Sequence, residues 1–509
     1  MARRGQEARH RDALRESGWD VRCPPPIVDK VSYFHRFRWV YCQLEVLRHC
    51  LPPSVTRILQ ELPETLDETY ERVLREIKKA NREHARRLLQ CLTVALRPLR
   101  VEELAEVLAI DFDAPAHGGI PQLNPHWRWA DHHQAILSTC SSLIAIVDDG
   151  DSKVVQFSHY SVKEYLTSDR LARSSQDVSR YHIVLEPAHT IIAQACLGVL
   201  LRLDDGVNND NVDEIPLVKY AAQYWFDHAQ FEKVASRIQD GMEYFFDADK
   251  PHWAAWCRVQ MIDKGWLWFG PESPRDAFPL YYASLGGFYD VAEHLVGKHP
   301  EQINAMGGLM GTPLVAALGG KHFEVAELLY RNGADVDVRD GYRDTPLHES
   351  CKAGVLDIQV VLWLLNHGAD VNAHGHAGQA PIHSAVDRGH TQIFRMLIEH
   401  NPDIHIRDVD GESPLHFAAR YRGRDRVDMM QVLLDHGANP NALDNNNSTP
   451  LHRSSRSGGR GAVEAICLLL KHGAIMDAEN DEGKTPLQLA LEHGHDDVAA
   501  CLKEHGATR

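Results

Sequence analysis

A four-residue signature recurs through the C-terminal half of the chain. Its clearest copies are Thr345-Pro346-Leu347-His348, Ser413-Pro414-Leu415-His416, Thr449-Pro450-Leu451-His452 and Thr485-Pro486-Leu487-Gln488. Weaker copies begin at Ala380, Thr312 and Phe278, and successive prolines lie 33 to 36 residues apart. Most copies close on Gly-Ala, as at Gly333-Ala334. A repeat of this length restricts the fold to stacked supersecondary units.

One unit predicts two helices. Thr345 is a good N-cap, and Pro346 suits the first helical position because its missing N–H would be unpaired there anyway. A second helix is expected at about Leu356–Asn366, with Val360 and Leu364 on its apolar face. Neither helix can bury its apolar face alone, so the units must stack into a solenoid.

The whole pattern resembles the ankyrin repeat. The resemblance implies seven units over residues 276–509, a structural role for the signature histidines in bonding neighbouring turns, and a concave surface that binds protein. Solenoids offer long surfaces rather than deep catalytic pockets, so we expect no enzyme activity and no small-molecule substrate.

Charge and cysteine content argue against several classes of protein. The formal net charge is −17, of which residues 1–100 carry +7 and the remainder −24, so nucleic acid is not expected as the main partner. The ten cysteines contain no Cys-x-x-Cys pair, which indicates reduced thiols rather than disulfides or a zinc site. The N-terminus lacks an apolar signal, and Ile191–Leu203 is too short to cross a bilayer. We expect a cytoplasmic protein with no membrane contact, no metal and no cofactor.

Upstream segments carry a second resemblance. Phe37–Leu44 and Leu62–Leu74 are similar to the end of the nucleotide-binding domain in fungal NACHT proteins, which are NOD-like (STAND) signalling ATPases often followed by ankyrin repeats. Residues about 82–170 resemble the winged-helix module of that family. Two helices (Arg82–Leu96, Arg100–Ile110), a third near His132–Cys140 and a hairpin (Leu143–Val147, Val154–Phe157) are expected. Phe157–Leu166 is the most distinctive motif.

The predicted fold is therefore mostly α. Its expected parts are a disordered segment (1–36), a remnant of the NACHT C-terminal helices (37–81), a winged-helix domain with a small β-hairpin (82–170), a helical spacer (171–275) and the ankyrin solenoid (276–509).

The phosphate-binding loop of the NACHT family is missing. The single Gly-Lys-Thr, at 483–485, lacks the glycine five residues earlier, where Ala478 stands, and it occupies the turn column of the repeat. In related ATPases a winged-helix histidine touches the nucleotide phosphate; without that loop, His159 is expected to be structural. The helix near 132–140 has no Lys or Arg, which disfavours DNA binding.

These observations predict a scaffold or sensor that binds a protein partner, as a NOD-like remnant without its ATPase. A truncated gene model of a nucleotide-switched NACHT ATPase is the alternative, and a regulatory subunit that targets an enzyme is a third possibility. Ankyrin specificity lies in variable surface columns. The candidate contact residues in these columns are Tyr342, Asp344, Lys352, His376, Gln379, Asp387, Arg388, Asp410, Glu412, Arg420, Tyr421, Asn446, Ser448, Arg456, Asp481, Glu482 and Lys484, with Tyr342, Arg388, Arg420 and Tyr421 ranked first.

Overall fold

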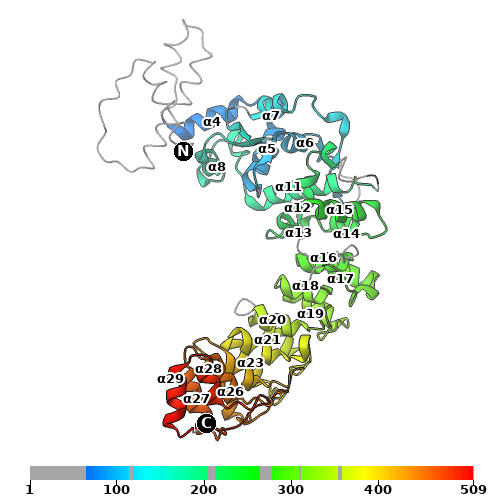
Figure 1. Cartoon of the computed structure of the whole chain (residues 1–509). Helices are drawn as coiled ribbons and strands as arrows, with labels where there is room; N and C mark the ends of the chain where they lie inside the picture. The colour runs from blue at the N-terminus through cyan, green and yellow to red at the C-terminus, as the bar shows by residue number, and fades with distance from the viewer. Residues whose placement is uncertain are drawn as a thin grey trace, which may run out of the picture. The chain divides into compact units, whose positions relative to one another are not determined.

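A computed structural model describes residues 65–507, apart from the short segments 114–118, 141, 151, 205, 207–211, 264–277, 309–310 and 354–357. The described chain is mostly helical with two small antiparallel sheets, as the sequence predicts (Figure 1). It divides into two compact units. The first ends at Gly241 and also takes in Ala254–Gly265; the second holds Met242–Trp253 and the repeats. The expectations for residues 1–64 lie outside the described residues.

The first unit opens with a capped helix. α4 (Leu66–Glu76) begins at a capping box, in which Thr65 Oγ1 accepts the Glu68 N–H at 3.2 Å and the Glu68 carboxylate accepts the Thr65 N–H at 3.3 Å. Three helices that pack on one another follow: α5 (Arg82–Val94), α6 (Val101–Val107) and α7 (His132–Cys140). Their core side chains, such as Leu88, Leu104 and Ile136, are almost completely buried.

A three-stranded sheet closes this helical group. The predicted hairpin is present as β4 (Ile144–Asp149) and β5 (Ser152–Phe157), paired antiparallel. The other edge of β5 pairs with β1 (Leu99–Arg100), which the sequence did not predict because two residues are too short to show alternation. A second small sheet joins β2 (Ile110–Asp111) to β3 (Gln122–Leu123).

Helices complete the first unit. The short α8 (Tyr160–Leu166), α9 (Asp169–Ala172) and α10 (Gln176–Ser179) lead to α11 (Leu185–Leu200), which packs against α5 and α12 (Val218–Ala229). α13 (Val234–Arg237) follows. The apolar stretch near 191–203 is thus part of a buried helix, as predicted. Among the described residues, no helix has the length and apolar content needed to span a bilayer.

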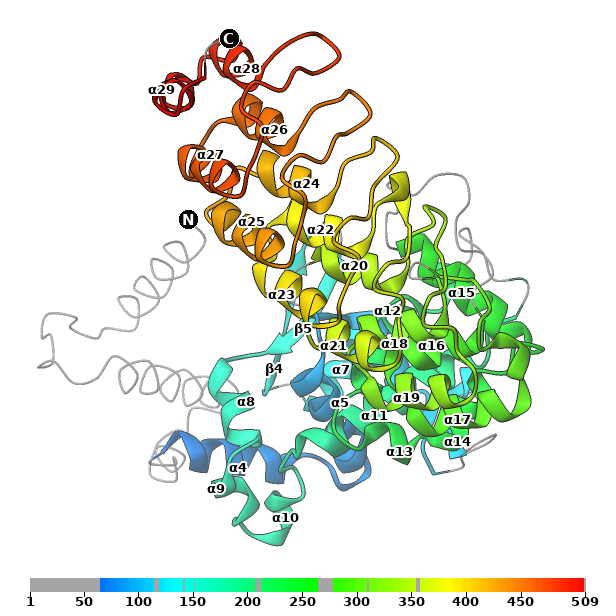
Figure 2. The same ribbon diagram turned by 90° about the horizontal axis from the view of Figure 1, so that it is seen from below.

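The second unit consists of helix pairs. Seven pairs occur within its described residues: α16 (Pro279–Gly286) with α17 (Tyr289–Lys298), α18 (Pro313–Gly319) with α19 (Phe323–Arg331), α20 (Pro346–Ala353) with α21 (Ile358–Asn366), α22 (Pro381–Arg388) with α23 (Thr391–Glu399), α24 (Pro414–Arg420) with α25 (Arg426–Asp435), α26 (Pro450–Ser457) with α27 (Ala462–Lys471), and α28 (Pro486–Glu492) with α29 (Asp496–Glu504). Figure 2 shows the first helices of the later pairs in one row and the second helices in another. We call these rows the inner and outer helices.

Aromatic residues ahead of the first pair belong to the repeat unit. α14 (Gln239–Phe245) and α15 (Pro251–Asp263) carry the chain across the division between the units. Phe246 lies against Phe288 with ring centroids 6.4 Å apart, and Trp253 against Tyr282 at 5.7 Å. The segment 242–253 therefore covers the apolar entrance of the first repeat.

Candidate protein-binding site

A histidine link joins each middle repeat to the next. His416 Nδ1 accepts the Ser413 N–H at 3.1 Å, and its Nε2 donates to the Ser448 carbonyl at 3.1 Å. His348, His383 and His452 make the same link to the carbonyls of Gln379, Glu412 and Lys484. Since Nδ1 must accept, the proton resides on Nε2. The predicted structural role of these histidines is confirmed.

Burial keeps these imidazoles neutral. Removal from solvent lowers the pKa of His383 and of His416 to about 4, and lowers the pKa of His348 and His452 as well. Both ring nitrogens already have backbone partners. The four side chains hold neighbouring turns at a fixed spacing.

An Asp or Asn side chain closes four of the turns, and His374 stands at this position in the fourth repeat. Asp444 Oδ1 accepts the N–H groups of Asn446 and Ser448, both at 2.8 Å. Asp340, Asp408 and Asn480 occupy the same position in their own turns. Successive turns also bond to each other, since the Asp481 N–H donates to the Asn446 carbonyl at 3.1 Å. The turn tips are therefore held side by side.

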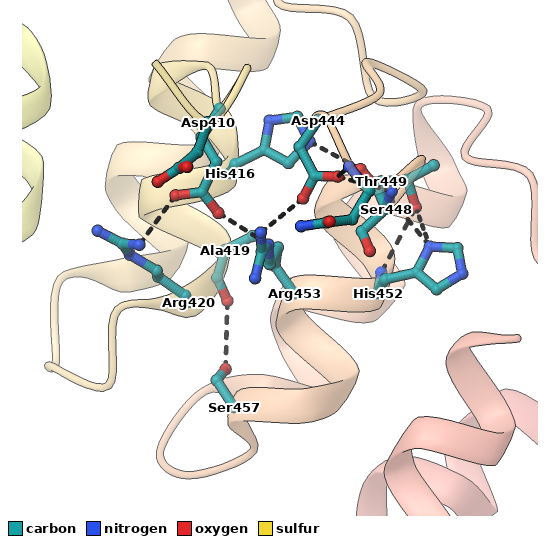
Figure 3. Close-up of polar contacts among 12 residues, drawn as sticks. Asp410, His416, Ala419, Arg420, Asp444, Ser448, Thr449, His452, Arg453 and Ser457 are labelled. Atoms are coloured by element: carbon teal, nitrogen blue, oxygen red, sulfur yellow. Dashed lines mark hydrogen bonds and ion pairs between the residues drawn. The ribbon is translucent and has the colours of Figure 1, made fainter. Parts of the chain in front are cut away.

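A buried ionic network underlies the inner face of the fifth and sixth repeats (Figure 3). Arg453 lies between two carboxylates, 2.8 Å from Glu412 Oε1 and 2.6 Å from Asp444 Oδ2. Arg420 reaches the other oxygen of Glu412 at 2.9 Å and Asp387 at 3.1 Å. Burial raises the pKa of Glu412, although the two arginines oppose this effect. The network ties three consecutive inner helices together.

Most of the predicted contact residues reach solvent. Tyr342 is 72% exposed, and its ring meets His376 edge-on. The other exposed ones are His376, Asp387, Arg388, Asp410, Asn446, Arg456, Asp481 and Glu482. Lys352, Gln379, Arg420, Tyr421 and Lys484 are half-buried. Their role in binding stays a prediction.

The structure corrects three of these predictions. Asp344, Glu412 and Ser448 are buried, with 2%, 2% and 7% of their surface exposed. Asp344 pairs with Lys352, Glu412 with two arginines, and Ser448 donates its N–H to Asp444. These buried residues offer no surface to a partner. Their side chains can differ from repeat to repeat because the bond that closes each turn uses their backbone N–H.

Two of the highest-ranked residues are partly committed to packing. The Tyr421 ring lies directly over Gly389 and Gly423, where an added Cβ would collide with it. Arg420 covers the Phe417 ring at 3.9 Å in addition to its two ion pairs. Tyr342 and Arg388 are the better candidates for contact with a partner.

One residue of this region, the buried Arg426, was not predicted from the sequence. Its side chain is inaccessible and donates to the carbonyls of Ala419 and Gly458, the latter at 2.8 Å. It also reaches the hydroxyls of Ser454 at 2.8 Å and Ser457 at 2.9 Å. The longer repeat spacing of 36 residues after Pro414 is the one sequence signal of an unusual arrangement here.

Two other features of the repeats have structural explanations. One group of three acids close enough to share a metal ion occurs among the described residues: Asp340, Asp344 and Glu349. Lys352 already pairs with the latter two, so the lysine compensates their charge. The Gly-Lys-Thr at 483–485 forms the turn before α28, where Thr485 is the N-cap and Lys484 pairs with Glu482 and Glu492.

The first unit contains a histidine cap and an apolar cavity. His159 is the N-cap of α8, and its Nδ1 lies 2.6 Å from Ser161 Oγ, which in turn lies 2.8 Å from Tyr70 Oη. Trp127 and Trp129, both about half exposed, line a cavity of about 300 Å³ beside α7.

Two known families match parts of this chain. Residues 70–177 match the winged helix domain of GPI inositol-deacylase. Overlapping matches to ankyrin repeats run from residue 280 to residue 508. Residues 280–508 are ankyrin repeats. The predicted ankyrin repeats are thus confirmed, and so is the winged-helix domain expected before them.

Known relatives share parts of this arrangement. The azaphilone pigments biosynthesis cluster protein L of Monascus ruber is 32% identical over 297 residues, 55% of this chain and 61% of that protein. A putative ankyrin repeat protein of Rickettsia felis is 39% identical over 101 residues, 19% of this chain and 44% of that protein. The Neurospora crassa ankyrin repeat protein nuc-2 is 31% identical over 120 residues, 24% of this chain and 11% of that protein. The chain thus spans less than two thirds of each of these relatives.

Proposed function

We propose that the protein is a scaffold or sensor that binds a protein partner on the concave inner face of its ankyrin repeats. The observation that carries this proposal is the continuous linkage of turns and inner helices by His383, His416 and their counterparts. Because these bonds fix the backbone before a partner arrives, little conformational entropy is lost on binding. Exposed, variable side chains then lie at matching places in successive repeats.

The winged-helix domain supports a finer proposal. Its match over residues 70–177, together with the resemblance of the preceding segments to NACHT proteins, favours a NOD-like (STAND) signalling protein. We propose that it acts without an ATPase of its own, since the Gly-Lys-Thr at 483–485 serves as a repeat turn. It is proposed to act in the cytoplasm, with no enzyme activity, cofactor, nucleic acid or membrane involved.

A nucleotide-switched ATPase is the alternative. The same winged-helix match favours it, because that module follows an ATPase core in the family that the sequence resembles. Sequencing transcripts across the 5′ end distinguishes the two proposals. A transcript that encodes a phosphate-binding loop in frame with residue 37 would favour the switched ATPase.

Capture of the partner tests the main proposal. The full chain serves as bait, and a recovered partner is titrated against single alanine variants of Tyr342, Arg388 and Asp410. A true hot spot costs about 1–3 kcal/mol of binding free energy on truncation. Alanine at Gln392 and Arg395, which are exposed on the outer helix α23, is the matched control. A partner that responds equally to both sets does not bind the inner face.

A further inference from the structure

The loops that join inner to outer helices are unusual in the fifth and sixth repeats. In the fourth repeat, two residues separate α22 from α23, and the second of them, His390, donates to the Lys352 carbonyl at 3.2 Å. The loops 421–425 and 458–461 are longer and contain no histidine. They carry arginine instead, at Arg422, Arg424 and Arg460.

Arg426 holds both of these loops in place. Its bonds to Ala419 and Gly458 reach the C-terminal ends of α24 and α26, where unpaired carbonyls carry partial negative charge. Burial lowers the pKa of Arg426 to about 10, so the guanidinium is still charged at neutral pH. The positive charge of Arg426 adds to that of the arginines on the two loops. The Arg422 side chain lies against Gly459 of the next loop, 3.6 Å from where a Cβ would stand, so the two loops are neighbours.

Five exposed arginines gather at this end of the inner helices: Arg388, Arg422, Arg424, Arg456 and Arg460. Among the described residues, none of the five has an ion-pair partner, whereas nearby Arg420 and Arg453 are each paired twice. We call the five the arginine platform.

Acidic residues near the platform do not cancel its charge. Asp387 is held by Arg420, and Glu482, whose pKa Arg456 helps to lower, is held by Lys484. The other acids on these loops and the helices that follow them are Asp425, Asp428, Asp435 and Glu464. Residues 420–460 contain seven arginines and four aspartates, a net charge of +3 in a chain of −17.

We propose that the arginine platform binds a segment of the protein partner rich in Asp and Glu. This inference rests on the proposed function, because it identifies the chemistry of the partner that the array takes. Guanidinium groups pair bidentately with carboxylates, and charge complementarity both guides encounter and selects the partner. The arginines extend over three repeats rather than converging on one point, which suits a row of carboxylates better than a single phosphate. The strongly negative charge of the remaining chain opposes nucleic acid.

The test measures binding of labelled peptides to the full chain. Fluorescence anisotropy compares a fluorescein-labelled polyglutamate peptide with a polyglutamine peptide of equal length. Polyglutamate is expected to bind, with an affinity that falls as salt rises. The triple variant Arg422→Glu, Arg424→Glu, Arg460→Glu is expected to weaken binding by about tenfold or more. A variant with the same charge change elsewhere, Arg331→Glu, Arg395→Glu, Arg407→Glu, is the control, and thermal melts confirm that both are folded.

Several results would overturn the inference. Equal affinity for polyglutamate and polyglutamine would show that the platform does not recognise carboxylates. An equal loss of affinity in both triple variants would show that polyglutamate responds to the net charge of the chain and not to the platform. Tighter binding of oligouridylate or of phosphatidylserine vesicles would assign the platform to nucleic acid or to a membrane. A captured protein partner whose affinity survives the platform variant would refute this inference and leave the proposed function standing.

Discussion

Acidification should loosen the middle of the repeat array through its buried histidines. His383 and His416 are neutral when folded, and each Nδ1 accepts a backbone N–H. Protonation would place a second N–H against that donor. The folded pKa of about 4 lies below the unfolded value of about 6.5. The stability that depends on these neutral rings is therefore complete above about pH 6.5 and is lost as the pH falls towards 4.

The magnitude follows from the two pKa values. At about pH 5.5 the unfolded ring is mostly protonated and the folded ring is not, which costs about 1.4 kcal/mol per histidine and about 3 kcal/mol for the pair. A loss of that size corresponds to a roughly hundredfold rise in the population of the open form. The effect is local, because each repeat contacts only its neighbours.

Hydrogen exchange followed by mass spectrometry provides the assay. Peptides that cover residues 380–420 should lose about a hundredfold in protection between neutral pH and about pH 5.5, after correction for intrinsic exchange rates. Glutamine is the substitution to use, because Gln488 occupies the histidine position in the last repeat and its Oε1 accepts the Thr485 N–H at 2.9 Å. The double variant His383→Gln, His416→Gln should be less protected at neutral pH yet almost insensitive to pH. His436→Gln, at an exposed histidine, is the control. Equal pH sensitivity in the wild type and the double variant would refute the reasoning.

Three other predictions follow from the fold. A fragment of residues 242–509 should stay soluble and melt cooperatively, whereas 276–509 should melt lower or aggregate because it loses the aromatic cover of its first repeat; equal melting curves would contradict this role. The full chain should give no heat of binding when titrated with Mg-ATP, and micromolar binding that Lys484→Ala abolishes would show that the Gly-Lys-Thr is functional. Arg426→Met should reduce the free energy of unfolding by about 2–4 kcal/mol, because it removes the Arg426 bond to the Gly458 carbonyl and leaves the Ala419 carbonyl with only the Ser457 hydroxyl at 3.3 Å; an unchanged urea midpoint would show that those carbonyls find other partners.

The repeat architecture could be predicted because a local rule generates it. The proline at the first helical position and the histidine three residues after the cap can be recognised in the sequence. The hairpin around Asp149 and Gly150 can be recognised there too. β1 could not be predicted, since its two residues acquire strand geometry only by pairing with β5. The burial of Arg426 could not be predicted either, because it depends on two helix ends that converge on this residue only in the folded structure.

The contact residues were harder to predict for a related reason. The sequence shows which equivalent positions differ between repeats, and such differences predict that the side chains there are exposed. Tyr342 satisfies that prediction, whereas Glu412 and Ser448 are buried and can differ because the bond that closes each turn uses their backbone N–H. Exposure depends on what the neighbouring repeat contributes, and no single unit contains that information.

The histidine link gives the array a direction. Each of these rings donates forward, to the turn of the repeat that follows it, whereas the loop histidines His390 and His495 donate backward, to the carbonyls of Lys352 and Arg456. Removal of the last repeat would leave the His452 Nε2–H with no acceptor and expose the acids and arginines of the sixth unit. Removal of the first repeat would break no forward bond of this kind, because Tyr281 and Val315 stand where later repeats have histidine. Damage from either end should therefore break histidine bonds: loss of the last repeat removes the acceptor of His452, and loss of an earlier repeat removes the acceptor of the loop histidine that follows it, as with His390 and Lys352.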